Sequence, residues 1–137
     1  MIDMEILHEI EQRLAKYPEL KYKIKGNSIT VFPVSENGFE VALYAGDESS
    51  HEPYEVHFNG WHERFSDKDE ALDCFVFGLT SECRLKESIR GDRVYKWTVE
   101  YLIDGKWQAD STTALLFFQF WKTRKDRYVR NSLQLRG

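Results

Sequence analysis

The Asn59-Gly60 dipeptide constrains this chain more strongly than any other feature of the sequence. It lies between two short runs, residues 54–58 and 61–65, that are rich in aromatic and β-branched side chains. Asn-Gly is a preferred pair for a two-residue type I′ turn, because both central residues of that turn adopt φ > 0. The sequence therefore predicts an antiparallel hairpin whose register is set by the length of the turn.

Two helices are predicted, one before the first strands and one after this hairpin. The first covers about residues 3–17, where apolar side chains recur at the spacing of one buried helical face, and Pro18 ends it. The second covers about residues 67–80, with Ser66 as the expected N-cap and acidic residues in its first turn.

Alternating apolar and polar residues, separated by turn residues, predict the other strands. A second two-residue turn at Asp104-Gly105 joins two of them into another hairpin. Residues 113–121 fit either a buried strand or an apolar helix; their aromatic content favours the strand, with residues 127–135 pairing beside it. The remaining expected strands cover residues 21–25, 28–34, 39–45, 84–89, 94–103 and 106–111.

This order of elements predicts an α+β fold, with one twisted, mainly antiparallel sheet and two helices packed on one face. No Pro-rich or Ser/Gly-rich linker divides the 137 residues, so residues 1–137 are expected to form a single α+β domain. Two short helices cannot cover so many strands, yet aromatic residues make up 15% of the chain. Apolar sheet surface is therefore expected to enclose a pocket or to meet a partner chain.

Composition narrows the class of protein. The longest apolar run, residues 114–118, is far shorter than a membrane helix requires, so no membrane association is expected. The N-terminus is acidic and carries no signal-peptide pattern, and two cysteines, Cys74 and Cys83, do not make a disulfide framework. A reduced, cytoplasmic location is the expectation that follows.

The clearest candidates for catalysis are His57 and His62, which the predicted hairpin places opposite each other. Cross-strand neighbours lie close enough for two imidazoles to share a proton or a metal, with His51 as a further ligand. The alternative is a solvated hairpin face. Glycine-rich phosphate loops and metalloprotease histidine spacing are both missing from the sequence, so no cofactor and no metal are expected.

Charge is distributed unevenly along the chain. The net charge is −4, yet residues 122–136 contain six basic side chains and one acidic side chain. Arg124, Lys125 and Arg127 in this segment are the candidates for nucleic-acid binding, with nearby aromatic rings available for stacking. The alternatives are an edge strand protected from aggregation by its charges, or a segment that docks on the acidic remainder of its own fold. Nucleic acid is not the favoured partner, because that remainder would repel a polyanion.

The sequence favours a non-enzymatic binding module for a small apolar ligand or a protein partner, and leaves the oligomeric state open. The expected ligand or partner surface lies near Trp107, Leu116 and Phe118. An enzyme that uses His57 and His62 is the second hypothesis, and a nucleic-acid binder is the third. The scarcity of catalytic motifs leans against an enzyme without deciding the question.

Overall fold

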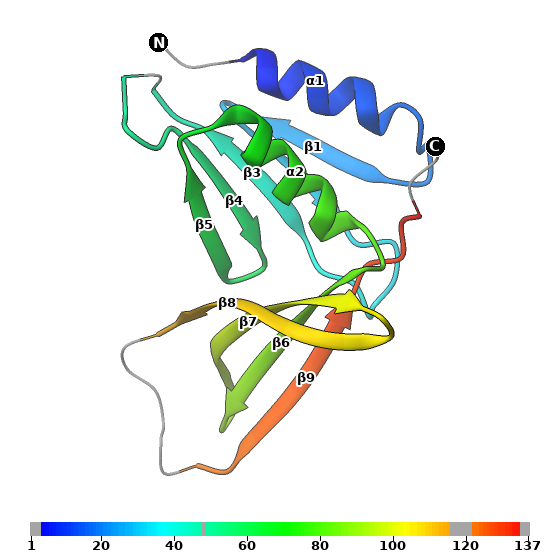
Figure 1. Cartoon of the computed structure of the whole chain (residues 1–137), viewed down its shortest axis with the longest axis vertical. Helices are drawn as coiled ribbons and strands as arrows, with labels where there is room; N and C mark the ends of the chain where they lie inside the picture. The colour runs from blue at the N-terminus through cyan, green and yellow to red at the C-terminus, as the bar shows by residue number, and fades with distance from the viewer. Residues whose placement is uncertain (1–3, 48, 116–121, 135–137) are drawn as a thin grey trace.

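The computed structural model describes residues 4–47, 49–115 and 122–134 and contains two antiparallel sheets and two helices (Figure 1). The helices are α1 (Glu5–Leu14) and α2 (Lys68–Leu79). A five-stranded sheet has the order β1-β2-β3-β4-β5, and a four-stranded sheet has the order β8-β7-β6-β9. The strands are β1 (Lys21–Lys25), β2 (Ser28–Phe32), β3 (Val41–Ala45), β4 (Tyr54–Phe58), β5 (Trp61–Phe65), β6 (Cys83–Arg90), β7 (Arg93–Ile103), β8 (Lys106–Ala114) and β9 (Arg124–Arg130).

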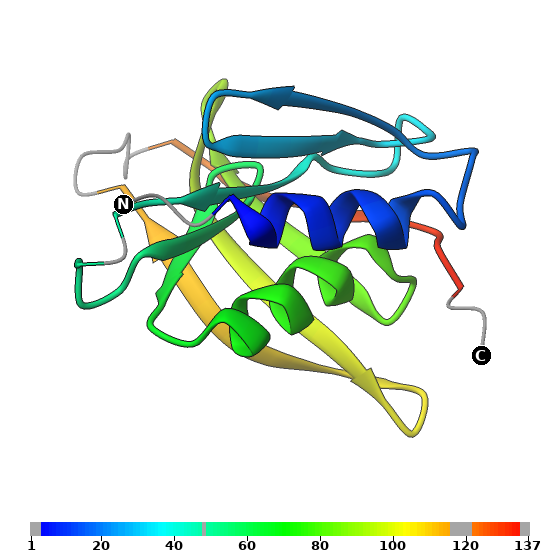
Figure 2. The ribbon, with the colours of Figure 1, turned by 90° about the horizontal axis from the view of Figure 1, so that it is seen from above.

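The predicted α+β class is confirmed, with the strands divided between two sheets. Both helices lie on the same side of the five-stranded sheet, as predicted (Figures 1 and 2). The four-stranded sheet packs below it, against α2 and the end of the β4–β5 hairpin (Figure 1). In the described part of the chain, neither helix is long and apolar enough to cross a membrane.

The second helix begins one residue later than the sequence suggested. Asp67, and not Ser66, is the N-cap, and its carboxylate accepts a hydrogen bond of 3.3 Å from the backbone N–H of Asp69. Both residues are good capping types, and the local sequence does not choose between them. Residue 3, where the first helix was expected to begin, lies outside the described residues.

The turns explain the hairpins, with one difference from prediction. Asp104 and Gly105 have φ of 52° and 75°, as a type I′ turn requires. Asn59 has φ of 52°, but Gly60 does not adopt a positive φ. Glycine is needed at position 60 for another reason: a Cβ there would overlap the indole ring of Trp97 on β7. The predicted register of the β4–β5 hairpin is confirmed at all five pairs.

The last strands pair differently from the prediction. β8 continues through Ala114, beyond the expected end at residue 111, and pairs with β7. β9 pairs with β6. Residues 127–135 were expected to pair beside residues 113–121, of which residues 116–121 lie outside the described part of the chain. That expectation assumed pairing between neighbouring segments, whereas β6 still has a free edge once β7 has paired with its other side.

A buried carboxylate joins the two sheets. Glu87 on β6 is only 3% exposed and points toward the five-stranded sheet. One of its oxygens accepts hydrogen bonds from the Arg127 guanidinium at 2.8 and 3.1 Å. The other accepts from the Trp97 indole at 3.1 Å and from the Asn59 side-chain amide at 3.3 Å. Glu87 therefore ties the tip of the β4–β5 hairpin to β6, β7 and β9.

Candidate functional site

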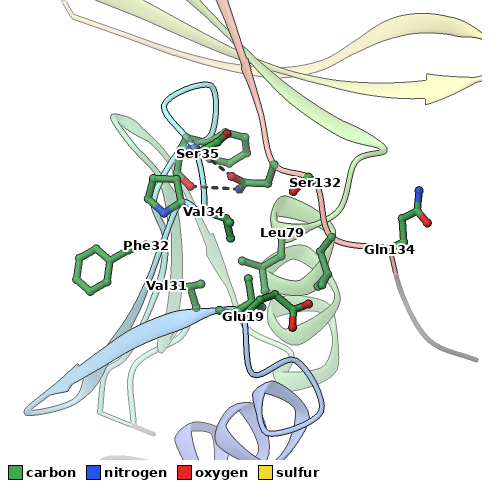
Figure 3. Close-up of a pocket in the computed structure, with 13 residues that line it drawn as sticks. Glu19, Val31, Phe32, Val34, Ser35, Leu79, Ser132 and Gln134 are labelled. Carbon is green, nitrogen blue, oxygen red and sulfur yellow. Dashed lines mark hydrogen bonds between the residues drawn. The ribbon is translucent and has the colours of Figure 1, made fainter.

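A groove of about 440 Å³ lies where the β2–β3 loop, the end of α2 and the C-terminal segment, residues 131–134, come together (Figure 3). Its size falls within the range of small-molecule sites. The apolar lining residues are Leu20, Val31, Phe32, Pro33, Val34, Phe39, Leu79 and Leu133, and the polar ones are Glu19, Ser35, Asn131, Ser132 and Gln134. We call it the Asn131 groove.

Asn131 holds the back wall of the groove together. Its side-chain oxygen accepts from the backbone N–H of Phe39 at 3.0 Å, and its amide group donates to the carbonyl oxygens of Phe39 at 3.2 Å and Gly78 at 2.9 Å. Gly38 permits this approach, because a Cβ there would lie 2.5 Å from the Asn131 oxygen. One side chain thus fixes the β2–β3 loop and the end of α2 relative to the C-terminal segment.

Backbone hydrogen bonds hold the C-terminal segment on the end of α2. Leu133 donates to the carbonyl of Leu79 at 3.2 Å and accepts from the N–H of Ser81 at 3.1 Å. Leu79 and Leu133 also line a second, smaller groove of about 250 Å³ between the ends of α1 and α2. The two leucines therefore lie between the two grooves. The backbone hydrogen bonds fix the walls of the Asn131 groove within the protein itself.

The Asn131 groove combines apolar side chains with a few hydrogen-bonding groups. Val34, which points into the groove in Figure 3, is 60% exposed, a high value for a valine beside other apolar side chains. Ser35, Ser132 and Gln134 offer hydrogen-bonding groups, and Glu19 carries the single charge among the described lining residues. The described lining residues include no histidine or cysteine.

His57 and His62 lie opposite each other, as predicted, with ring centroids 5.4 Å apart and the rings stacked. His57 Nε2 lies 2.8 Å from a carboxylate oxygen of Glu55, and the other oxygen of Glu55 lies 3.5 Å from Arg64 Nε. The rings of Tyr44 and His57 pack in a T-shaped arrangement, with their centroids 4.9 Å apart. Except for His62, these side chains border an open depression on the outer face of the five-stranded sheet. The enzyme hypothesis based on the two histidines stays a prediction.

Metal and thiol chemistry find little support in the described residues. Within them, no group of three or more His, Cys, Asp or Glu side chains is placed to hold a metal ion. Burial raises the pKa of the Cys83 thiol to about 12, and burial also raises the pKa of Cys74. Both thiols are therefore protonated at neutral pH and are poor nucleophiles.

Of the residues predicted to form a ligand or partner surface, Trp107 is described, and it does not line the groove. Trp107 is on the outer face of the four-stranded sheet, with its ring 4.5 Å from the Arg84 guanidinium and 5.1 Å from that of Arg130. Leu116 and Phe118 lie outside the described residues. Trp107 is thus part of an aromatic and guanidinium stack that includes Tyr128, whose ring lies 4.2 Å from Arg84.

The three basic nucleic-acid candidates lie on β9 but do not share a face. Arg127 points inward and binds Glu87, and Lys125 has the same parity along the strand. Arg124 is on the outer face, where it donates to Asp126 at 3.0 Å and to Ser88 at 3.2 Å. Two of the three cations thus already have partners within the fold. This agrees with the idea that the basic segment docks on its own protein.

The Asn131 groove was not found from the sequence. Residues 28–34 and 127–135 were each interpreted as continuous strands, whereas β2 ends at Phe32 and β9 ends at Arg130. The available signal was Val34, an apolar residue directly after Pro33, which ends the strand. In comparisons with known protein families, with curated proteins and with solved structures, the chain has no match.

Proposed function

We propose that this chain is a non-enzymatic binding module that holds a small apolar molecule in the Asn131 groove. The observation that carries the proposal is a preformed groove of about 440 Å³ whose walls combine exposed apolar side chains with hydrogen-bonding groups. Ligand pockets are typically concave, mostly apolar and formed before the ligand arrives, with a few polar groups that orient it. Asn131 supplies the rigidity, because its three hydrogen bonds fix the walls.

The lining also indicates what kind of small molecule fits. An apolar body would lie against Pro33, Val34 and Leu133, which keep part of their surface exposed, and hydrogen-bonding groups would reach Ser132 or Gln134. Among the described residues, Glu19 is the one charged residue that lines the groove, and its carboxylate would repel a negatively charged ligand. The favoured ligand is therefore neutral or positively charged, with one or two polar groups on an apolar body.

The test is a fluorescence titration with N-phenyl-1-naphthylamine, a neutral apolar probe. We expect saturable enhancement with the parent protein and loss of about tenfold or more in affinity for Val34→Asp, because a carboxylate placed in an apolar site must be desolvated. Val34 is exposed, so this change should leave the fold intact.

Ile103→Asp is the matched control, since Ile103 is a similarly exposed apolar residue at the tip of the β7–β8 hairpin. This variant should bind the probe like the parent. Absence of saturable binding to the parent, or equal weakening by the two substitutions, would refute the proposal.

A further inference from the structure

A second binding surface lies at the edge strand β1, on a different part of the molecule from the Asn131 groove. β1 is the first strand in the order of the five-stranded sheet and, within the described residues, pairs with β2 alone. All five of its residues are exposed. Figure 2 shows β1 at the margin of the sheet, with α1 on one side. An edge strand of this kind presents unpaired N–H and C=O groups.

The side chains of β1 divide cleanly between the two faces of the sheet. Lys21, Lys23 and Lys25 lie on the outer face, opposite Phe32, Thr30 and Ser28 of β2. Within the described part of the chain, no acidic side chain pairs with these lysines. They are spaced two residues apart, as are the side chains on one face of any neighbouring strand.

The other face of β1 is apolar and only partly covered. Tyr22 and Ile24 lie on the same side of the sheet as α1, opposite Val31 and Ile29 of the core. They remain 39% and 38% exposed. The Tyr22 hydroxyl donates to Glu11 of α1 at 3.1 Å, which raises the pKa of Tyr22 and fixes its ring beside the helix.

The backbone of β1 is oriented for a further strand. Lys25 pairs with Ser28 across a two-residue turn, so the lysines direct their N–H and C=O groups toward β2. Tyr22 and Ile24, which alternate with the lysines, then direct their backbone N–H and C=O groups toward the free edge of the sheet. The same two residues therefore offer both the hydrogen-bonding groups and the apolar surface.

Lysines on an edge strand can simply prevent aggregation. That explanation accounts for the outer face of β1 but not for Tyr22 and Ile24, because an edge that only repels other strands has no use for exposed apolar side chains. A second copy of β1 is also a poor occupant, since antiparallel self-pairing would place lysines opposite lysines.

We propose that β1 is the docking site for an extended segment of a protein partner, which adds to the sheet as a sixth strand. The segment alternates acidic residues, which face Lys21, Lys23 and Lys25, with apolar residues, which cover Tyr22 and Ile24. Main-chain hydrogen bonds supply affinity and the alternating side chains supply specificity, as in other cases of strand addition. This inference does not depend on the Asn131 groove.

The test uses the full chain labelled with ¹⁵N and a short synthetic peptide that alternates glutamate and valine. We expect the peptide to shift the backbone amide signals of Tyr22 and Ile24. A peptide of the same composition in a non-alternating order should bind at least several-fold more weakly, because it cannot present acids on one face and valines on the other.

Two variants make the test specific. The first is a triple variant that reverses the charge of the outer face, Lys21→Glu with Lys23→Glu and Lys25→Glu. It should bind the glutamate–valine peptide roughly tenfold more weakly and should bind a lysine–valine peptide instead, because three exposed charge pairs become repulsive with the first peptide and attractive with the second. Ile24→Pro should also lose binding, because it removes an N–H that faces the free edge, a position where strands tolerate proline. Their folds are checked by circular dichroism.

Several results would overturn the proposal. They are equal binding of the alternating and non-alternating peptides, shifts located away from β1, or no shift at all. Tighter binding of a single-stranded oligonucleotide to the same amides would assign the lysines to a nucleic acid instead. Dimerisation of the free protein that is abolished by Ile24→Pro would assign the edge to a second copy.

Discussion

At the scale of single residues, Gly60 shows how a turn position can be fixed by a residue that is distant in the sequence. A Cβ on Gly60 would overlap three carbon atoms of the Trp97 ring. The ring is held in place because its Nε1–H donates to buried Glu87 at 3.1 Å. The turn therefore packs against β7 only if position 60 lacks a side chain.

The substitution Gly60→Ala tests this contact by the sign of its effect. Where there is room and φ is not positive, replacing glycine by alanine stabilises a protein by about 0.4–1 kcal/mol, because it restricts the unfolded chain. Here we expect a loss of about 1–3 kcal/mol, the usual range for overpacking. Urea unfolding followed by circular dichroism measures the difference.

The background variant Trp97→Leu provides the control. Removing the ring makes room for the Cβ, so Gly60→Ala should cost less in this background than in the parent. An equal cost in both backgrounds, or stabilisation of the parent, would show that the ring does not limit position 60.

At the scale of secondary structure elements, local signals predicted most of the fold. The Asn59-Gly60 and Asp104-Gly105 turns, and the helical spacing of the residues buried in α2, are patterns within a few residues, and the structure contains each of these elements. The register of β4 with β5 followed from turn length alone. Elements of this kind are specified by their own sequence.

Pairings between distant segments could not be predicted in the same way. β6 and β9 are separated by two strands in the sequence, and nothing in the composition of either one identifies the other as its partner. The irregularity between Val99 and Glu100 in the pairing of β7 with β8 leaves no sequence signal either. The candidate groove depends on such long-range contacts, so only Val34 hinted at it.

The C-terminal segment supplies a prediction at this scale. Asn131→Ala removes three hydrogen bonds and leaves the N–H and C=O of Phe39 and the C=O of Gly78 without their partner. We expect a loss of about 1–3 kcal/mol in the free energy of unfolding, the cost of leaving buried polar groups unpaired.

Ser132→Ala is the matched control, because this neighbouring residue lines the same groove and is exposed. It should change stability by no more than about 0.5 kcal/mol, as is usual for surface positions. Similar losses for the two variants, measured by urea unfolding, would mean that Asn131 does not organise the segment.

At the scale of the whole molecule, the question is what keeps the two sheets together. Trp61 of the first sheet donates to Ser111 of the second at 3.0 Å, and the Asn59 turn rests on Glu87. Glu87 receives four hydrogen bonds, from the hairpin turn, β7 and β9. A buried carboxylate is tolerated only when it is paired and fully hydrogen-bonded, so its partners cannot be lost independently.

We therefore expect the effects of Glu87 and Arg127 substitutions on the free energy of unfolding to be strongly coupled. Glu87→Gln replaces one carboxylate oxygen by an amide N–H₂ group. That group then faces either the Asn59 and Trp97 donors or the Arg127 guanidinium, none of which can accept its hydrogens. Arg127→Gln leaves the buried Glu87 carboxylate without its cation. Each change is expected to cost about 1.5–3 kcal/mol, because charge-assisted hydrogen bonds around the buried Glu87 position are lost, although the Arg127 side chain itself is 57% exposed.

The double variant tests whether these losses share one cause. With both charges removed, the second substitution no longer leaves a buried charge without its partner, so the combined loss should fall short of the sum by about 1–3 kcal/mol.

The matched comparison is Arg124→Gln with Asp126→Asn, an exposed pair at 3.0 Å on the outer face of the same strand. That pair should show coupling below about 1 kcal/mol, as exposed ion pairs do.

Unfolding is followed by tryptophan fluorescence and by circular dichroism, whose transitions should coincide if the sheets unfold together. Additive losses at Glu87 and Arg127, or separate transitions in the parent, would mean that each sheet is stabilised on its own and that the carboxylate is only a local contact.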